Sequence, residues 1–210
     1  DETWVDEWGT TFRKLGLYAD PVGPVLRGKS LAEIRAYRPP DPVHPSRFHG
    51  VRERARALFE QTDYALASGP IFCIDYVRWV LRGLEQSVAD LYEEPALAEY
   101  MLDLVVDWMS AHGARLLDEL GSTIDIFWTG DDWGAQTCPF YSPEMFRRVF
   151  KPRIAKLIAA LKKHTAAKCC YHCCGSVYWA MQDLVDCGVD ILHPLQPNAA
   201  DNGDSERIKR

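Results

Sequence analysis

The stretch Lys168-Cys-Cys-Tyr-His-Cys-Cys-Gly175, with the run that follows it to Pro194, decides how this chain folds. Its first part is a short strand that ends in metal-capable side chains, and its final glycine supplies a turn. Residues 176–187 then carry apolar side chains at helical spacing, and residues 189–192 form a second apolar strand. This strand–helix–strand order is typical of a parallel sheet covered by helices.

The strand in this stretch also predicts half of a metal site. Alternate side chains of an extended segment share a face, so we expect Cys170, His172 and Cys174 to point together. Imidazole and thiolate groups at one strand end suit zinc, with Cys173 as an alternative thiol. The competing interpretation is a buried strand end in which the cysteines pack as small apolar residues and His172 makes a hydrogen bond.

The bulk composition fits one or two globular domains, with 210 residues of which 47% are hydrophobic. A net charge of -6 argues against nucleic acid or an anionic membrane surface as partner. No apolar run approaches the ~20 residues needed to span a bilayer. Seven cysteines, four of them crowded into 169–174, favour reduced thiols and a cytoplasmic location. Since the chain lacks an initial Met and ends in what reads as the first turn of a helix, we expect truncation at both ends.

Residues 14–50 are predicted to be an irregular, proline-rich excursion, with six prolines between 14 and 48. Within it, Ser30 and Glu33 form a capping-box signature for a short helix over Ser30–Tyr37. The other predicted helices are Arg52–Gln61, Tyr76–Leu91, Pro95–Leu120, 143–164 with a kink or break at Pro152, Ser176–Cys187, and Ser205–Arg210. The predicted strands are 1–13 as a strand or hairpin, Tyr64–Ala67 before a turn at 68–70, Ile124–Trp128, Ala166–His172 and Val189–Leu192.

Alternating strands and helices leave a choice between a doubly wound sheet and a (β/α)8 TIM barrel. No G-x-G-x-x-G turn follows any strand, which removes the strongest dinucleotide-binding signal. In both architectures, polar residues at the carboxyl ends of strands build the site. A barrel takes roughly 250 residues, so this chain would be an incomplete one.

Several motifs in order resemble the uroporphyrinogen decarboxylase superfamily, and its methyltransferase-like branch in particular. The segments that resemble the branch are Asp6–Gly9, Gly130–Gln136, Tyr141–Phe146, Lys151–Arg153, His172–Ser176 and Gly188–Gln196. Ser68–Pro70 with Tyr76 and Gly83 resembles a segment of the superfamily as a whole. The resemblance implies a single (β/α)8 barrel domain over residues 1–210 with its site at the carboxyl face. It also implies an enzyme with a small-molecule substrate.

The resemblance leaves two chemistries open. One is zinc-dependent methyl transfer with a corrinoid protein or a thiol, in which His172 and Cys174 bind zinc together with a thiol further along the chain. The alternative is cofactor-free decarboxylation of uroporphyrinogen, in porphyrin biosynthesis, or of a related carboxylated substrate. A third hypothesis is a non-catalytic subunit that binds a corrinoid or a metal.

Three residues are candidates for catalysis. Asp131 and Asp132 are adjacent and project in different directions, so one of them is expected to face the pocket. A carboxylate there could ligate a metal, orient His172 or exchange a proton with substrate, and otherwise would cap the next helix. The resemblance assigns a substrate contact to Tyr76, whose alternative role is packing at a helix start.

Three further residues are candidates for substrate binding. Gln136 lies near the aspartates, where a turn-stabilising amide is the alternative. His193 stands where the branch usually has Asn, so it could change substrate contacts, add a metal ligand or make a structural hydrogen bond. Gln196 matches the branch's motif and is predicted to line the pocket.

Overall fold

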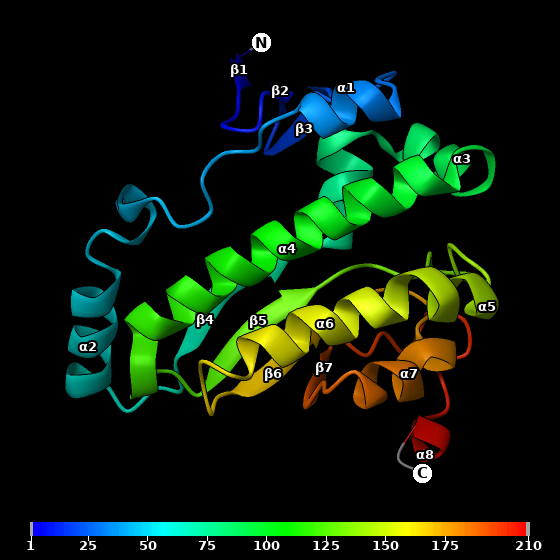
Figure 1. The fold of residues 1–210 in the computed structure, drawn as a ribbon. Coiled ribbons are helices and arrows are strands. Elements are labelled where there is room, and N and C mark those ends of the chain that lie inside the picture. The colour runs from blue at the N-terminus through cyan, green and yellow to red at the C-terminus, as the bar shows by residue number, and fades with distance from the viewer. Residues whose placement is uncertain (1, 209–210) are drawn as a thin grey trace. The chain divides into compact units, whose positions relative to one another are not determined.

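The computed structural model describes residues 2–208, which form two compact units. The first consists of Asp1–Pro42 and Cys73–Val105, and the second of Val43–Phe72 and Val106–Arg210. The chain passes from one unit to the other three times, and the last crossing falls within the long helix α4 (Pro95–Leu120). Each unit is described separately below, and Figure 1 gives the element labels.

The first unit contains a three-stranded antiparallel sheet built from β1 (Thr3–Val5), β2 (Thr11–Leu15) and β3 (Tyr18–Gly23). The strand or hairpin predicted over residues 1–13 is therefore present. A third strand, β3, adds to it from the stretch that was expected to be irregular. Helix α1 (Leu31–Ala36) follows with the predicted capping box, in which Ser30 and Glu33 exchange side-chain and backbone hydrogen bonds.

The helical region predicted over Tyr76–Leu91 is present, but it is divided into two elements. The structure has a π-helical segment, η2 (Tyr76–Leu81), followed by the separate helix α3 (Leu84–Glu93). Gly83 divides them at φ +89, a conformation that side-chain-bearing residues rarely adopt. The predicted region did not specify this break.

The second unit is built on a parallel sheet in the order β4-β5-β6-β7, the same as the chain order. Its strands are β4 (Ala67–Phe72), β5 (Ile126–Gly130), β6 (Lys168–His172) and β7 (Ile191–His193). Because each crossover advances one strand in the same direction, right-handed connections put the connecting helices on one face of the sheet. A doubly wound sheet instead reverses its order at a switch point, which these four strands do not contain.

The helical elements between and around these strands complete the second unit (Figure 1). Helix α2 begins one residue before its predicted start and ends at Gln61 as expected. The helical elements of this unit are η1 (Pro45–Phe48), α2 (Val51–Gln61), the end of α4, η3 (Gly121–Thr123), α5 (Pro143–Met145), η4 (Phe146–Phe150), α6 (Lys151–Leu161), η5 (Tyr178–Ala180), α7 (Met181–Asp186) and α8 (Ser205–Ile208). Residues 209 and 210, the end of the last predicted helix, lie outside the described residues.

The strand predicted at Tyr64–Ala67 is displaced toward the carboxyl end, and the turn predicted at residues 68–70 is wrong. Strand β4 runs through Ser68-Gly-Pro70 and shifts register between Ala67 and Pro70. At that irregularity the Ser68 hydroxyl accepts a hydrogen bond from the Trp128 N–H at 3.0 Å. A side chain thus replaces a backbone partner, which lets a sequence with turn character join the sheet.

The break expected near Pro152 is present as a change in helix type. Three elements follow one another without a gap, since α5 leads into the π-helical η4 and α6 begins at Lys151. Proline has no backbone N–H, so the normal hydrogen-bond pattern cannot run through residue 152, and the wider π turn precedes it.

The sheet places its residues on two faces in strict alternation. Phe127, Thr129, Cys169 and Tyr171 are all less than 2% exposed on the helix-covered face. Gly113 of α4 packs there, since a side chain at that position would meet Leu161 and Ile71. Cys170 and His172 alternate with these residues and lie on the opposite face.

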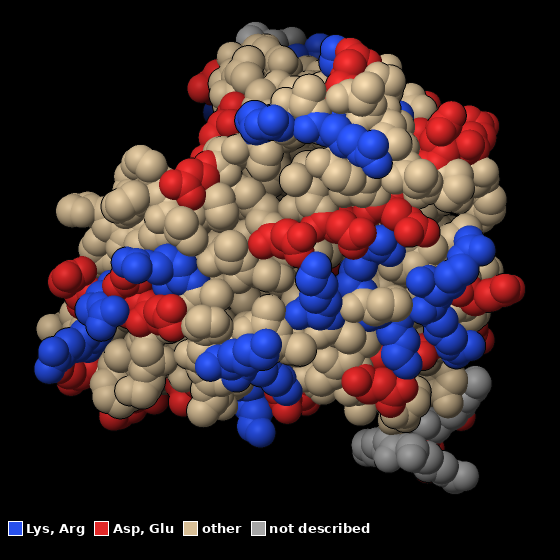
Figure 2. Space-filling view, in the orientation of Figure 1, with Lys and Arg blue, Asp and Glu red and all other residues tan. Residues whose placement is uncertain are grey.

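Charged side chains of both signs are interspersed on the face shown in Figure 2. Surface ion pairs include Lys156–Asp107 at 2.6 Å and Arg56–Glu60 at 2.8 Å. Among residues 2–208, no helix combines the length and the apolar character required to cross a bilayer.

Candidate metal centre

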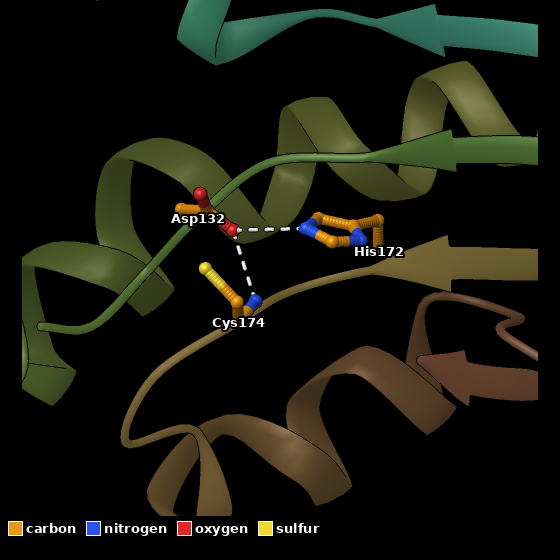
Figure 3. A group of neighbouring side chains, drawn as sticks. All are labelled: Asp132, His172 and Cys174. Carbon is orange, nitrogen blue, oxygen red and sulfur yellow. Dashed lines mark hydrogen bonds and ion pairs between the residues drawn. The ribbon is translucent and has the colours of Figure 1, made fainter. Parts of the chain in front are cut away.

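The carboxyl ends of β5 and β6 bring together three metal-capable side chains from the second unit: Asp132, His172 and Cys174 (Figure 3). One ligand atom from each, an oxygen, a nitrogen and a sulfur, lies within 4.8 Å of the other two. Asp132 Oδ1 lies 3.6 Å from His172 Nε2 and accepts a hydrogen bond from the Cys174 N–H at 2.9 Å. The carboxylate thus joins the two residues of the H-x-C pair.

The sheet register explains why these residues meet. Gly130 lies opposite His172 in the β5–β6 ladder, and the Asp131 N–H donates to the His172 carbonyl at 3.0 Å. Asp132 and Cys174 each lie two residues beyond this pair, so they occupy equivalent positions just after β5 and β6. Because the strands are parallel, both loops emerge at one edge of the sheet.

Two glycines allow the loops to approach one another at backbone distance. A side chain at Gly134 would collide with the Ser176 backbone, and one at Gly175 would collide with the carbonyls of Gly134 and Ala135. Gly175 also has φ +75, which favours glycine. The Ser176 N–H donates to the Ala135 carbonyl at 2.9 Å, so the two loops are hydrogen-bonded to each other.

The donor set fits zinc in its chemistry. Imidazole nitrogen, thiolate sulfur and carboxylate oxygen are the three ligand types that Zn²⁺ uses in proteins. The side chains of His172 and Asp132 are 28% and 32% exposed, so the ligand atoms are accessible from solvent while still held by the loops.

The Cys174 thiol is held protonated in the metal-free chain. Desolvation raises its pKa to about 11, and the hydrogen bond to Asp132 with the charge of that carboxylate adds to the effect. A cation bound between the two groups would oppose both contributions from Asp132 and displace the thiol proton. Burial also raises the pKa of the Cys170 and Cys173 thiols, and neither residue belongs to the group of three described above.

Asp131 and Asp132 point to different places, as their adjacency predicts. Asp131 is 1% exposed, and its Oδ2 accepts a hydrogen bond from the Tyr171 hydroxyl at 3.2 Å. That hydroxyl in turn accepts from the Trp133 indole N–H at 3.0 Å. Asp131 thus belongs to a buried polar network, whereas Asp132 faces His172 and Cys174.

The amides and the second histidine lie beside the cluster. Gln136 Nε2 donates to Gln196 Oε1 at 3.2 Å, so the two predicted substrate-binding amides contact each other. His193 lies opposite His172 in the β6–β7 ladder, with ring centroids 5.7 Å apart. The His193 ring also packs edge-on against Trp128, with ring centroids 5.2 Å apart. Trp128, His193 and His172 thus form a row of aromatic rings.

Tyr76 belongs to the first unit. Its hydroxyl donates to Asp6 Oδ2 at 3.2 Å, and its ring packs on Trp8 with centroids 5.0 Å apart. Burial, together with the charge of Asp6 and the hydrogen bond to it, raises the pKa of Tyr76 well above its ordinary value.

A family model described as uroporphyrinogen decarboxylase (URO-D) matches residues 16–198. The chain belongs to the uroporphyrinogen decarboxylase family. This confirms the family predicted from the motifs, and the four sequential parallel strands are strands of its (β/α)8 barrel.

Comparison with solved structures supports the same fold. A methyltransferase from Methanosarcina mazei matches with a TM-score of 0.60 at 18% sequence identity. The match covers 89% of this chain and 52% of the methyltransferase, so the chain spans about half the length of that protein. No curated protein matches the chain significantly.

Sequence reasoning did not single out Tyr171 or Asn202, which both support the loops around the cluster. Tyr171 carried a weak signal, because it lies between Cys170 and His172 and must face the other side of the sheet. Asn202 lies nine residues after β7 in a loop, and nothing in its sequence context indicates its contacts.

Proposed function

We propose that the chain is the metal-binding part of a zinc-dependent methyltransferase, acting on a small molecule with a corrinoid protein or a thiol as methyl carrier. The observation that carries the proposal is the convergence of Asp132, His172 and Cys174 within 4.8 Å at the carboxyl edge of the sheet. The motif resemblance to the methyltransferase-like branch and the shared fold of the M. mazei methyltransferase add support.

In this proposal, His172, Cys174 and Asp132 hold the metal. Zinc bound there would lower the pKa of a coordinated substrate thiol, so that the thiolate is available as nucleophile at neutral pH. A catalytic zinc site also keeps a coordination position for substrate or water.

The chain's own groups prepare this site. Asp132 fixes the Cys174 backbone through the 2.9 Å hydrogen bond and provides negative charge next to both other ligands. His193 and Trp128 form an aromatic wall next to His172, which would shield one side of the site from water and orient an apolar methyl donor.

The direct test is metal analysis of the full-length protein after purification in the presence of zinc. We expect about one zinc per chain in the parent, and a loss of this zinc in His172→Ala and Cys174→Ser. His164→Ala and Cys138→Ser are matched controls, because His164 pairs with Asp118 outside the cluster and Cys138 is exposed. A metal-replete parent protein without stoichiometric zinc would contradict the proposal.

The second candidate is cofactor-free decarboxylation of uroporphyrinogen, which the family's description favours. Such a reaction makes no use of an imidazole, a thiol and a carboxylate placed within ligand distance of one another. The two candidates are separated by assaying coproporphyrinogen formation alongside methyl transfer from methylcobalamin to a simple thiol. Zinc-independent formation of coproporphyrinogen would favour decarboxylation over the methyltransferase.

A further inference from the structure

The segment that follows β7, Gln196–Asn202, hydrogen-bonds to the loops that carry Asp132 and Cys174. Gln196 Oε1 accepts from the N–H of Gly175, the residue directly after Cys174, at 2.5 Å. The same oxygen accepts from Gln136 Nε2 at 3.2 Å. One side-chain oxygen therefore links the β5 loop to the β6 loop next to a proposed ligand.

Asn202 holds the other side of the β6 loop. Its side chain is almost completely buried, with the residue 2% exposed, and Nδ2 donates to the Gly175 carbonyl at 2.8 Å. Its Oδ1 accepts from the N–H groups of Val177 and Tyr178 at 3.3 and 3.1 Å. With Gln196, it thus satisfies four backbone groups between 175 and 178.

The β5 loop is held by the same segment. The Ala200 N–H donates to the Gln136 carbonyl at 2.8 Å. Asp201 has φ 64, an uncommon conformation for a residue other than glycine, and turns the chain immediately before Asn202. The segment therefore contacts both loops through backbone as well as side-chain groups.

We propose that Gln196 and Asn202 are positioning residues that hold Cys174 in its ligating position and thereby set the metal affinity of the site. This inference rests on the proposed metal function. Neither residue is one of the three ligands, and both act on the backbone on the carboxyl side of Cys174. Without them the loop has unpaired polar groups, rearranges, and must be ordered again when a metal binds.

The test titrates the full-length protein with Co²⁺ as a probe and with Zn²⁺ in competition, comparing Gln196→Met and Asn202→Ala with the parent. Met removes the acceptor at nearly constant size, and Ala removes all three Asn202 hydrogen bonds. Loss of supporting groups around metal ligands typically lowers affinity about 10–100-fold, which is the decrease we expect. The thiolate-to-cobalt charge-transfer absorption, to which ligation by Cys174 contributes, should weaken in the same variants.

Two further variants separate positioning from a general loss of structure. Gln196→Glu keeps the accepting oxygen and should retain the affinity and the charge-transfer band. Asn198→Ala changes an exposed asparagine of the same segment and should behave like the parent. Circular dichroism and thermal unfolding of the metal-free proteins monitor folding. If Asn202→Ala does not fold because the replaced side chain is buried, the metal affinity of Gln196→Met, at a half-buried position, decides whether the positioning role holds.

The outcomes distinguish this inference from the proposed function. Equal cobalt affinity and equal charge-transfer absorption in the parent and in the folded variants would overturn the positioning role alone. A parent protein that binds neither metal would overturn the proposed metal function and this inference with it.

Discussion

The Tyr171 hydroxyl donates a hydrogen bond to Asp131 across 3.2 Å, and both residues are about 1% exposed. Tyr171 precedes His172 on β6, and Asp131 precedes Asp132 after β5, so this buried pair lies directly behind two of the proposed ligands. In each pair of adjacent residues, the first side chain is buried in the helix-covered core and the second faces the cluster.

We expect Asp131→Ala to affect mainly stability and Asp132→Ala to affect mainly zinc binding. Asp131→Ala removes the buried carboxylate that accepts the Tyr171 hydrogen bond, which should lower the free energy of unfolding by about 1–3 kcal/mol and leave zinc affinity nearly unchanged. Asp132→Ala removes a proposed ligand and should weaken zinc binding by more than the about 10–100-fold typical of outer-shell partners, with a smaller loss of stability. Urea unfolding and zinc competition measure the two effects. Loss of turnover in Asp131→Ala at unchanged stability would return Asp131 to a catalytic role.

The reactivity of Cys174 should depend on Asp132 in a defined direction. The metal-free thiol has a pKa of about 11, so its alkylation rate should still rise with pH at pH 10. Asp132→Asn removes the carboxylate charge, which should move the inflection to lower pH while desolvation keeps it above the ordinary value. Peptide-resolved mass spectrometry of iodoacetamide labelling, with the exposed Cys138 as internal reference, gives the profile. An inflection that moves upward would contradict the assigned cause.

A side chain at Gly175 should disrupt the metal site through the backbone. Gly175→Ala places a residue with a side chain at φ +75, which costs about 1–3 kcal/mol, and also pushes the β6 loop away from Gly134 and Ala135. We expect reduced stability together with weaker zinc binding. Gly69→Ala is the matched control, because a side chain there meets no atom within 4 Å. Parent-like zinc affinity in Gly175→Ala would show that loop contact is not required.

We expect the buried Arg82–Asp90 ion pair to be important for the stability of the first unit. Arg82 Nε lies 2.7 Å from Asp90 Oδ2, both side chains are at most 3% exposed, and the guanidinium also donates to the carbonyls of Leu26 and Lys29. Arg82→Ala leaves a buried carboxylate without its cation and should cost about 3–5 kcal/mol.

Chemical unfolding of Arg82→Ala is compared with Arg56→Ala, whose exposed pairing with Glu60 should contribute little. The double variant Arg82→Met/Asp90→Leu should recover part of the loss, since it removes both charges. A loss in Arg82→Ala no larger than in Arg56→Ala would mean that the buried pair contributes no more than a surface pair.

The sequence predicted the elements whose signals are local. The capping box at Ser30, the long helix Pro95–Leu120 and the strand ending at His172 all depend on nearby residues, and the structure has each of them. The strand at Ser68-Gly-Pro70 was missed because its participation depends on a hydrogen bond to Trp128, 60 residues away. The two π-helical turns were missed because apolar spacing does not distinguish them from α-helix.

The candidate site shows the same limit. Adjacency predicts that Asp131 and Asp132 diverge, but it does not predict that Asp131 is the buried one that accepts a hydrogen bond from Tyr171. The H-x-C spacing places His172 and Cys174 near one another, whereas the approach of Asp132 depends on the register of two strands whose paired residues are 42 positions apart in the chain. Asn202 could not be found, because its partners are fixed by the path of a loop.

The backbone contact between the β5 and β6 loops at Gly134 and Gly175 has a thermodynamic consequence. Since the loops are already ordered against each other, the conformational entropy of assembling the ligands is lost when the protein folds. A metal ion would then enter a preorganised site, and chelation would remove the ion without melting the sheet beneath it.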